Sequence, residues 1–256
     1  MIKDFYDKHK NFSSRTLIEY YISPGIKCKF DILKANIETK KKYSYGIDLG
    51  SSGNSFLFFI DNISKRFSLD IADLPLKQYI HRTEWYPLCG DIMKLPYRDS
   101  SFDFLSALDV IEHIKDDEYV ISEISRVLKN NGIVVITVPH RMKYYTNQDR
   151  LIGHYRRYEF PTIASRFKKY NLKVIRTFGV YGKLMRIADI QSSNPKKIET
   201  NLLNLRKRYM SDGRFRRIWD FFIKYSSMFM KIDAKYHSLK KAMNIGIIFR
   251  KVKQLQ

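Results

Sequence analysis

The sequence predicts an α/β fold: a seven-stranded, mostly parallel sheet with an antiparallel last strand, N-terminal helices and a helical insertion before that strand. Two observations support this prediction. Short apolar runs alternate with segments of helical spacing, as they do in βαβ units. The continuous apolar run at 132–139 is typical of a strand that helices cover on both faces.

The N-terminal half alternates apolar runs with turn residues. Residues 1–40 have a helical pattern, which Pro24-Gly25 should interrupt. Strands are expected at 43–50, 66–72, 85–91 and 102–110, and the apolar run 55–60 suits a buried helix.

The C-terminal half continues this alternation. Residues 117–129 have apolar side chains at helical spacing, and Asn131-Gly132 should end that helix. Further strands are expected at 132–139, 172–180 and 244–252, with a helix from near Pro161 and a mostly helical segment at 183–241. We therefore expect a helical cap (1–42), an α/β core (43–182 and 242–256) and a basic helical insertion (183–241).

Composition limits the class of protein. The chain has 256 residues and 44% hydrophobic residues, which fits a globular domain. Its first residues are charged and lack the apolar core of a signal peptide, and it has no apolar run of membrane-spanning length. Its two cysteines form neither a zinc pattern nor a disulfide framework, so a reducing, cytoplasmic setting is expected.

The net charge of +21 is unevenly distributed. Residues 195–256 hold 16 Lys and Arg against 4 Asp and Glu, a net of +12, which leaves +9 for the other 194 residues. Such a segment indicates an anionic partner: nucleic acid, an acidic membrane surface or a phosphorylated substrate. A solvated, Lys-rich surface without such a partner is the alternative.

The segment 215–232 has an apolar stripe at helical spacing. It consists of Ile218, Phe221, Phe222, Tyr225, Met228 and Phe229, and it is accompanied by Arg214, Arg216, Arg217, Lys224 and Lys231. Packing in the core is the commonest reason for such a stripe. The alternatives are a cap over the active site and peripheral contact with an anionic membrane.

Small residues and carboxylates follow the predicted strands in a pattern that suits a nucleotide. The loop from Gly46 to Ser55 lets the backbone approach a ligand and precedes a helical run. Asp70 lies 20 residues after Gly50, where a Rossmann-type site places an acid on the ribose hydroxyls. Asp91 ends the third strand, and a polar cluster at 107–114 ends the fourth.

Over about residues 44–160, the chain resembles the class I S-adenosylmethionine-dependent methyltransferases, in particular their type 11 group. The resemblance is carried by GDIMKLPYRDSSFDFLSALDVIEHI (90–114) and EISRVLKNNGIVVITVP (123–139). The family motif D-x-G-x-G-x-G is matched at Asp48 and Gly50, but Ser52 and Asn54 replace the other two glycines. The resemblance implies a Rossmann-like fold and S-adenosylmethionine as the cofactor, and it disfavours NAD.

The resemblance also implies roles for individual residues. Gly50, Ser51 and the loop to Gly53 would pack against the methionine part of the cofactor, and Asp48 would help to hold its ammonium group. Asp70, followed by Ile71, would accept from the ribose hydroxyls, while Asp91 and the Ile92 N–H would contact adenine. Leu108 and Asp109 would line the sulfonium side.

The segment DRLIGHYRRYEF (149–160) is the best candidate for contact with the methyl acceptor. His154 is the candidate general base, because histidine is the side-chain type that titrates near neutrality. Arg156 and Arg157 are candidates for holding a carboxylate or phosphate, and Tyr155 and Tyr158 for walling the pocket. The alternative is structural: the segment folds over the cofactor site and orders the helix near Pro161. Methyl transfer from a sulfonium requires no metal, and the histidine spacing predicts no metal site.

The sequence is therefore compatible with three functions. The favoured one is methylation of a small-molecule or lipid-linked acceptor. An RNA methyltransferase recruited by its basic surface is less favoured, because no RNA-binding module is present. A protein that binds S-adenosylmethionine without catalysis is the third, because of the altered glycine motif.

Overall fold

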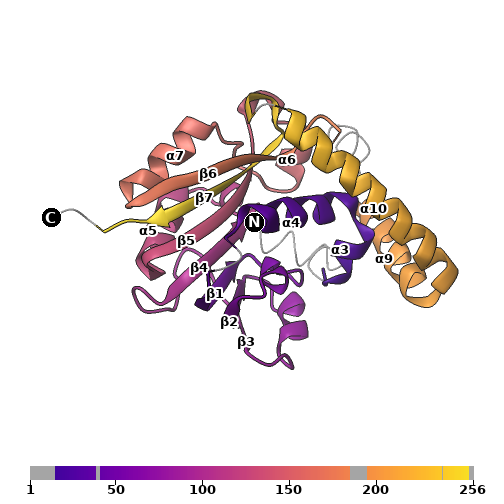
Figure 1. The fold of residues 1–256 in the computed structure, drawn as a ribbon, viewed down its shortest axis with the longest axis horizontal. Coiled ribbons are helices and arrows are strands. Elements are labelled where there is room, and N and C mark those ends of the chain that lie inside the picture. The colour runs from indigo at the N-terminus through magenta and orange to yellow at the C-terminus, as the bar shows by residue number, and fades with distance from the viewer. Residues whose placement is uncertain (1–14, 39–40, 185–194, 238, 254–256) are drawn as a thin grey trace.

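The computed structural model describes residues 15–38, 41–184, 195–237 and 239–253 (Figure 1). Its seven-stranded sheet has the order β3-β2-β1-β4-β5-β7-β6. The strands are β1 (Tyr43–Leu49), β2 (Ile63–Asp70), β3 (Trp85–Cys89), β4 (Phe102–Leu108), β5 (Leu128–Pro139), β6 (Leu172–Tyr181) and β7 (Asn244–Lys251). All pairings from β3 to β5 are parallel, whereas β7 runs antiparallel to both neighbours. The predicted fold class is confirmed.

Alternating side chains of the strands build a core on each face of the sheet. On β5, Val135 contributes to one core and Val134 to the other. The first core includes residues of α4 (Pro24–Asn36), and the second includes residues of α5 (Asp117–Val127) and α7 (Phe160–Lys169). Because both faces are covered, β5 is apolar along its central length, as the run at 132–139 predicted.

The N-terminal helical segment breaks where the sequence predicted. Helix α3 (Ile18–Ile22) ends before Ser23, and α4 begins at Pro24. The Ser23 side chain accepts the N–H of Ile26 at 3.4 Å. Proline fits the first helical position, where its missing N–H would have no partner. The part of the prediction that covers residues 1–14 lies outside the described residues.

The prediction of a buried helix at 55–60 is wrong in the type of helix and in its length. Only a single 3-10 turn, η1 (Phe56–Phe59), is present. β2 begins as early as Ile63, so the connection is too short for several helical turns. The rings of Phe56 and Phe59 pack against Phe30 of α4, with centroids 5.5 and 5.1 Å apart. Helix α4 therefore covers the face that the expected helix would have covered.

The helix expected at 117–129 also ends differently. α5 ends at Val127, and β5 begins at the next residue. Asn131 and Gly132 lie within β5, where the pairing with β4 shifts register, and Asn131 has a φ of +62°. These two residues therefore shape a strand irregularity and do not terminate the helix.

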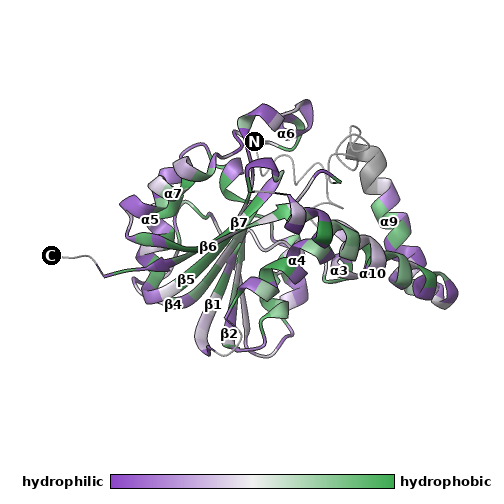
Figure 2. Ribbon diagram, turned by 45° about the horizontal axis from the view of Figure 1, so that its top comes forward, coloured by the Kyte–Doolittle hydropathy of each residue, from purple (hydrophilic) through white to green (hydrophobic). Residues whose placement is uncertain are grey.

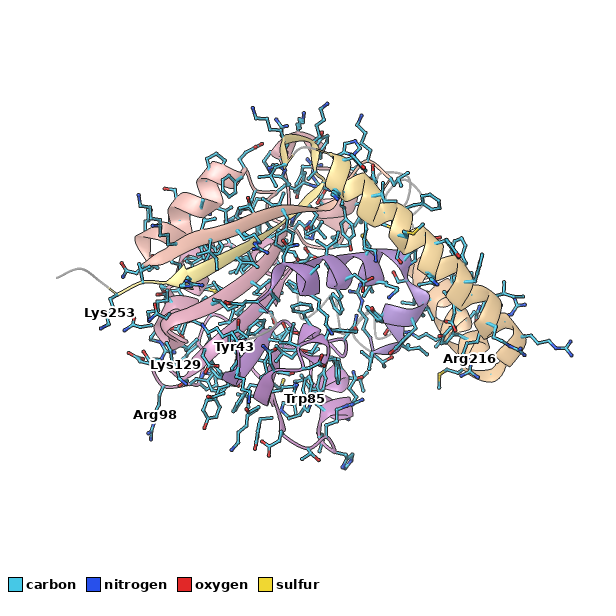
Figure 3. All side chains as sticks on the ribbon, in the orientation of Figure 1. Tyr43, Trp85, Arg98, Lys129, Arg216 and Lys253 are labelled. Carbon is cyan, nitrogen blue, oxygen red and sulfur yellow. The ribbon has the colours of Figure 1, made fainter. Side chains whose placement is uncertain are left out.

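The segment before β7 forms a helical hairpin of α9 (Pro195–Ser211) and α10 (Gly213–Tyr236). Asp212 joins the two helices and caps α10 by accepting the N–H groups of Arg214 and Phe215, both at 2.9 Å. The hairpin extends beyond the sheet, and Arg216 lies near its outer end (Figure 3). No helix in these described ranges combines the length and apolar character that crossing a bilayer requires.

One face of α10 packs against the N-terminal helices. Trp219 donates its indole N–H to the carbonyl of Ile22 at 3.2 Å, and Lys231 pairs with Asp31 at 2.9 Å. Ile223 and Ala234 are buried on this face. These contacts hold the hairpin against the α/β core.

The predicted apolar stripe lies on the opposite face, and the expectation that it packs in the core is wrong. Its six members are exposed: Ile218 (71%), Phe221 (64%), Phe222 (50%), Tyr225 (38%), Met228 (39%) and Phe229 (58%). Ile232 and Tyr236 continue the stripe at 43% and 80% exposure. Figure 2 shows hydrophobic residues along α10 where it extends beyond the sheet.

Candidate functional site

Asp48, in β1, is the buried anchor of the loop that follows. Its carboxylate accepts the hydroxyls of Ser106 and Ser55 at 2.5 and 2.7 Å and the N–H of Phe56 at 3.1 Å. Burial raises the pKa of Asp48 to about 6, although these hydrogen bonds act in the opposite direction. Both carboxylate oxygens thus have partners within the protein, and the contact with a cofactor ammonium group stays a prediction.

The glycine loop takes the sharp turn that its sequence indicates. Gly50 has a φ of +66°, and a Cβ there would lie 2.5 Å from Val110. Ser52, at the altered motif position, also has a positive φ of +46°. Gly53 is enclosed, because a Cβ would collide with the carbonyl oxygen of Arg15 and with the side chain of Gln78. Gly50 is exposed, whereas Ser51 and Gly53 are buried.

Asp70 closes this loop from the end of β2. Its Oδ2 accepts the N–H of Ser52 at 2.7 Å, and its Oδ1 accepts the N–H of Ala72 at 2.9 Å. The residue is 8% exposed, and burial raises the pKa of its carboxyl group despite these bonds. Ile71 beside it is half-buried. The structure thus joins Asp70 to the glycine loop, a contact that the sequence did not predict.

Asp91 lies just beyond the neighbouring strand end. Asp70 is paired with Cys89 in the register of β2 and β3, so Asp91 follows two residues after that pairing. Its side chain is exposed and accepts the N–H of Met93 at 2.8 Å. Ile92 is buried. The two predicted carboxylates therefore come from adjacent strand ends.

Asp109 follows β4 and pairs with a residue that the sequence did not single out. Lys29 of α4 lies 2.8 Å from its Oδ2, while Thr137 and Asn244 donate to its Oδ1 at 2.8 and 2.7 Å. Burial by itself would raise the pKa of Asp109, but Lys29 and these hydrogen bonds lower it to about 2. The neighbouring Leu108 is half-buried. Nothing local in the sequence could have connected α4 with this loop.

The candidate base His154 is held by Asp149 of α6 (Asn147–Leu151). His154 Nδ1 lies 2.8 Å from Asp149 Oδ1, and Arg157 donates to the same carboxylate at 2.8 to 3.1 Å. Asp149 is 2% exposed. Burial acts to raise the pKa of Asp149, but His154 and Arg157 outweigh it and lower the pKa. Arg157 is therefore paired within the protein.

Asp117, at the start of α5, bonds to two other residues of the segment 149–160, which the sequence predicted to contact the methyl acceptor. Arg156 lies 2.8 Å from its Oδ2, and the Tyr158 hydroxyl donates to the same oxygen at 2.7 Å. Arg166 of α7 pairs with it as well. Tyr158 is 3% exposed, whereas Tyr155 is exposed. These contacts favour the structural interpretation of the segment 149–160 and leave Tyr155 as its exposed aromatic residue.

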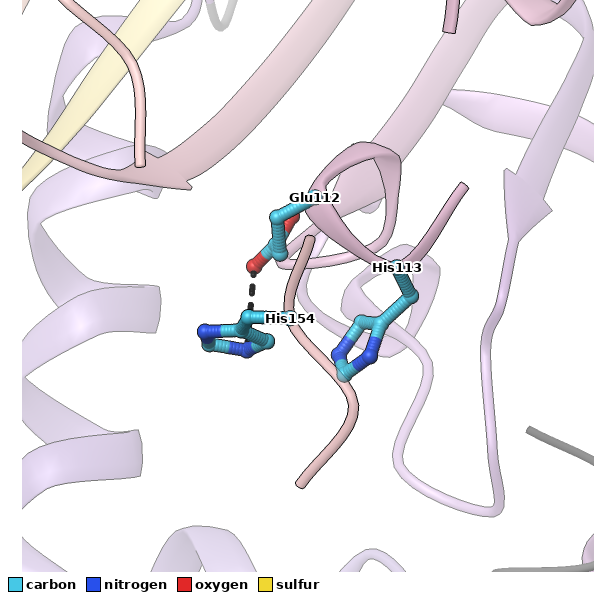
Figure 4. A group of neighbouring side chains, drawn as sticks. All are labelled: Glu112, His113 and His154. Carbon is cyan, nitrogen blue, oxygen red and sulfur yellow. Dashed lines mark ion pairs between the residues drawn. The ribbon is translucent and has the colours of Figure 1, made fainter. Parts of the chain in front are cut away.

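A second cluster lies directly beside His154 (Figure 4). Glu112, in the 3-10 turn η3 (Ile111–His113), is fully buried, and neither carboxylate oxygen has a hydrogen-bond partner within the described ranges. His154 Nε2 lies 3.8 Å from Glu112 Oε1, and the rings of His113 and His154 are 4.6 Å apart. Burial lowers the pKa of His113 to about 4. The polar cluster at 107–114 contains Glu112 and His113, but the sequence did not connect it with His154, because the two segments are far apart in the chain.

Comparison with known proteins supports the resemblance seen in the sequence. Residues 47–136 match the family described as methyltransferase domain. A protein of Methanocaldococcus jannaschii without an assigned function is 25% identical over 186 residues, which cover 70% of this chain and 78% of that one. A demethylmenaquinone methyltransferase of Lactobacillus johnsonii is 38% identical over 68 residues, 27% of this chain and 28% of its own.

Solved structures agree on the fold. Phosphoethanolamine N-methyltransferase 2 of Haemonchus contortus, in complex with S-adenosyl-L-methionine, superposes with a TM-score of 0.63 at 19% identity. The superposition covers 99% of this chain and 60% of that one. The match to the methyltransferase domain over residues 47–136 thus confirms the resemblance in that part of the chain, and the solved structure confirms the fold.

Proposed function

From the methyltransferase domain over residues 47–136, we propose that this chain is an S-adenosylmethionine-dependent methyltransferase. The observation that carries this proposal is the convergence of Asp48, the Gly50 loop and Asp70 at the carboxyl ends of β1 and β2. In open α/β sheets, ligands bind outside the carboxyl ends of the strands.

The residues at this edge fit the cofactor. The Asp70 carboxylate accepts the backbone N–H groups of Ser52 and Ala72, and a carboxylate has about four lone pairs, which leaves acceptor capacity for the ribose hydroxyls. The exposed carboxylate of Asp91 has further acceptor capacity for the adenine amine. The lack of a Cβ at Gly50 keeps the turn narrow where the backbone would approach the ligand.

Each site residue then has a role in binding. Asp70 would hold the ribose, and Asp91 and the Ile92 N–H would hold the adenine. The loop from Gly50 to Gly53, anchored by Asp48, would contact the methionine part. Leu108 and Asp109 would lie on the sulfonium side. The bound cofactor supplies an electrophilic methyl group, so the protein mainly has to orient the acceptor toward it.

Isothermal titration calorimetry with S-adenosylmethionine and with S-adenosylhomocysteine tests this binding. Saturable binding of one molecule per chain is expected for both compounds. The absence of binding by a folded protein would overturn the proposal. Binding without transfer to any acceptor would support the non-catalytic alternative.

For the acceptor, we propose a lipid-linked molecule reached at an anionic membrane surface. The exposed stripe of α10 is the supporting observation, because large apolar side chains exposed along one helix face need a partner. Exposed Arg217, Lys224 and Lys235 lie along one side of this stripe. An amphipathic helix with basic flanks suits an interface with acidic lipids, and the net charge of +21 adds attraction. His154 stays the candidate general base if the acceptor must lose a proton.

The competing acceptor is RNA, which the basic charge alone would also attract. Transfer of tritiated methyl groups into a total lipid extract and into total RNA separates the two. Radioactivity in the organic phase is expected. Label in the RNA, with binding that weakens steeply as salt rises, would instead favour an RNA methyltransferase.

A further inference from the structure

Glu112, His113 and His154 form a cluster with the composition of a metal site. One ligand atom from each of the three side chains can be chosen so that all lie within 4.8 Å of one another (Figure 4). Two imidazoles and one carboxylate are ligands that divalent transition metals bind. The cluster joins η3 to the segment that follows α6, so its parts meet only in the folded chain.

Glu112 is buried and, within the part of the chain described, keeps both carboxylate oxygens free of hydrogen bonds, as a metal ligand would. Nδ1 of His113 is likewise buried and has no hydrogen-bond partner there. Burying a carboxylate without a partner is costly, so native proteins pair such groups with hydrogen-bond donors or cations.

His154 is already oriented as a metal ligand would be. Its Nδ1 lies 2.8 Å from Asp149 Oδ1, which leaves Nε2 facing Glu112 at 3.8 Å. Asp149 is itself fixed by Arg157, and the Tyr145 hydroxyl donates to the His154 carbonyl at 2.7 Å. A carboxylate on the outer nitrogen of a ligating histidine fixes the ring and its tautomer in metal sites.

We propose that Glu112, His113 and His154 bind one divalent transition-metal ion, with Zn²⁺ as the ion to test. Ligand atoms about 2.0–2.2 Å from one zinc ion lie roughly 3.4 Å apart in tetrahedral geometry. The ligand atoms here lie within 4.8 Å of one another, so the widest separation would have to shorten by up to about 1.4 Å on binding. Three protein ligands leave at least one position for water or another ligand. The ion would neutralise Glu112 and fix the loop after β4, which also contains Asp109. This site does not depend on the proposed methyl transfer. With Nδ1 held by Asp149 and Nε2 bound to a metal, however, His154 could not also act as the general base.

Zinc binding can be measured in a Cys89→Ser background, because Cys89 is an exposed thiol that could bind zinc on its own. Equilibrium dialysis followed by metal analysis should give one tightly bound zinc per chain and a higher Tm. Glu112→Gln, which keeps the shape and removes the charge, should weaken binding at least about 100-fold and abolish the Tm increase. His237→Gln is the matched control, because His237 also contacts a carboxylate, that of Asp233, but lies outside the cluster.

Zinc that binds Glu112→Gln as tightly as the parent protein, or a parent that binds none, would overturn the proposal. If Glu112→Gln fails to fold, His154→Gln provides the same comparison. Titration of the same samples with S-adenosylmethionine tests the proposed cofactor site separately from the proposed metal site. A parent that binds the cofactor but no zinc would refute only the metal site, and one that binds zinc alone would refute only the cofactor site.

Discussion

Lys29 and Asp109 are 80 positions apart in the chain, and their side chains meet at 2.8 Å beside the carboxyl end of β4. Lys29 belongs to the N-terminal α4, and Asp109 to the loop predicted to line the sulfonium side of the cofactor. The pair therefore links the N-terminal helices to the candidate site. It also places a fixed positive charge where a cationic cofactor is expected.

Replacing Lys29 should destabilise the protein in a pH-dependent way. At pH 7, Lys29→Met should lower the free energy of unfolding by about 2 kcal/mol, because the Asp109 carboxylate loses a charged hydrogen-bond donor. In the unsubstituted protein the pKa of Asp109 is lowered to about 2, against about 4 in an unfolded chain. Its stabilising contribution is thus present above about pH 4 and is lost as the pH falls to about 2.

Urea unfolding at several pH values measures this effect. The difference in the free energy of unfolding between the Lys29→Met variant and the unsubstituted protein should become smaller as the pH falls from about 4 to about 2. Lys34→Met is the control, because its partner Asp61 is highly exposed and surface ion pairs contribute little. A difference that stays constant down to pH 3 would exclude the Asp109 pair as its source.

Asp70→Ala should weaken S-adenosylmethionine binding by about 10- to 100-fold, because a hydrogen bond to a charged group contributes roughly 1.5–3 kcal/mol. The substitution also frees the N–H of Ser52, so the glycine loop should loosen. Calorimetry measures the affinity, and Asp61→Ala provides an exposed control. Unchanged affinity in the Asp70 variant would remove this residue from the site.

Arg157→Met should distinguish a structural from an acceptor-binding role. Arg157 and Asp149 are 8% and 2% exposed at their side chains, so breaking this pair should cost about 3 kcal/mol of folding stability. Chemical denaturation measures this loss, and Lys169→Met, which breaks an exposed pair with Glu118, is the control. Unchanged stability together with a raised KM for the acceptor would favour direct acceptor contact.

The exposed stripe of α10 should govern membrane binding. Phe221→Glu and Phe229→Glu should each weaken partition into phosphatidylglycerol vesicles by about 10-fold or more, because burying one such side chain contributes roughly 1.5–3 kcal/mol. Co-sedimentation measures the partition, and phosphatidylcholine vesicles should bind little. Ile80→Glu replaces an equally exposed apolar residue elsewhere and should leave binding unchanged.

Light scattering on the same variants tests another use of the stripe. A dimer that dissociates in Phe221→Glu, with no change in vesicle binding, would mean that the stripe joins two copies of the chain. Such a result would refute the proposal that the stripe binds membranes.

Features encoded over short stretches of sequence could be predicted. The run at 132–139 specified a covered strand, and Pro24 marked a helix start, because burial pattern and backbone restriction act over a few residues. The sharp turn at Gly50 and the position of Asp70 at the end of β2 were also predictable from spacing along the chain. Asp91 was expected to end the third strand but lies two residues beyond the end of β3.

Tertiary structure alone decided which side chains meet and which faces are covered. A helical stripe in sequence does not specify its partner. α10 packs its other face on α3 and α4, which leaves Phe221 and Phe229 exposed. The spacing of residues along the sequence likewise did not predict the contact between Lys29 and Asp109, or that between Glu112 and His154. The physical reason is that local periodicity determines the type of element, whereas contacts between distant elements depend on how the whole chain packs.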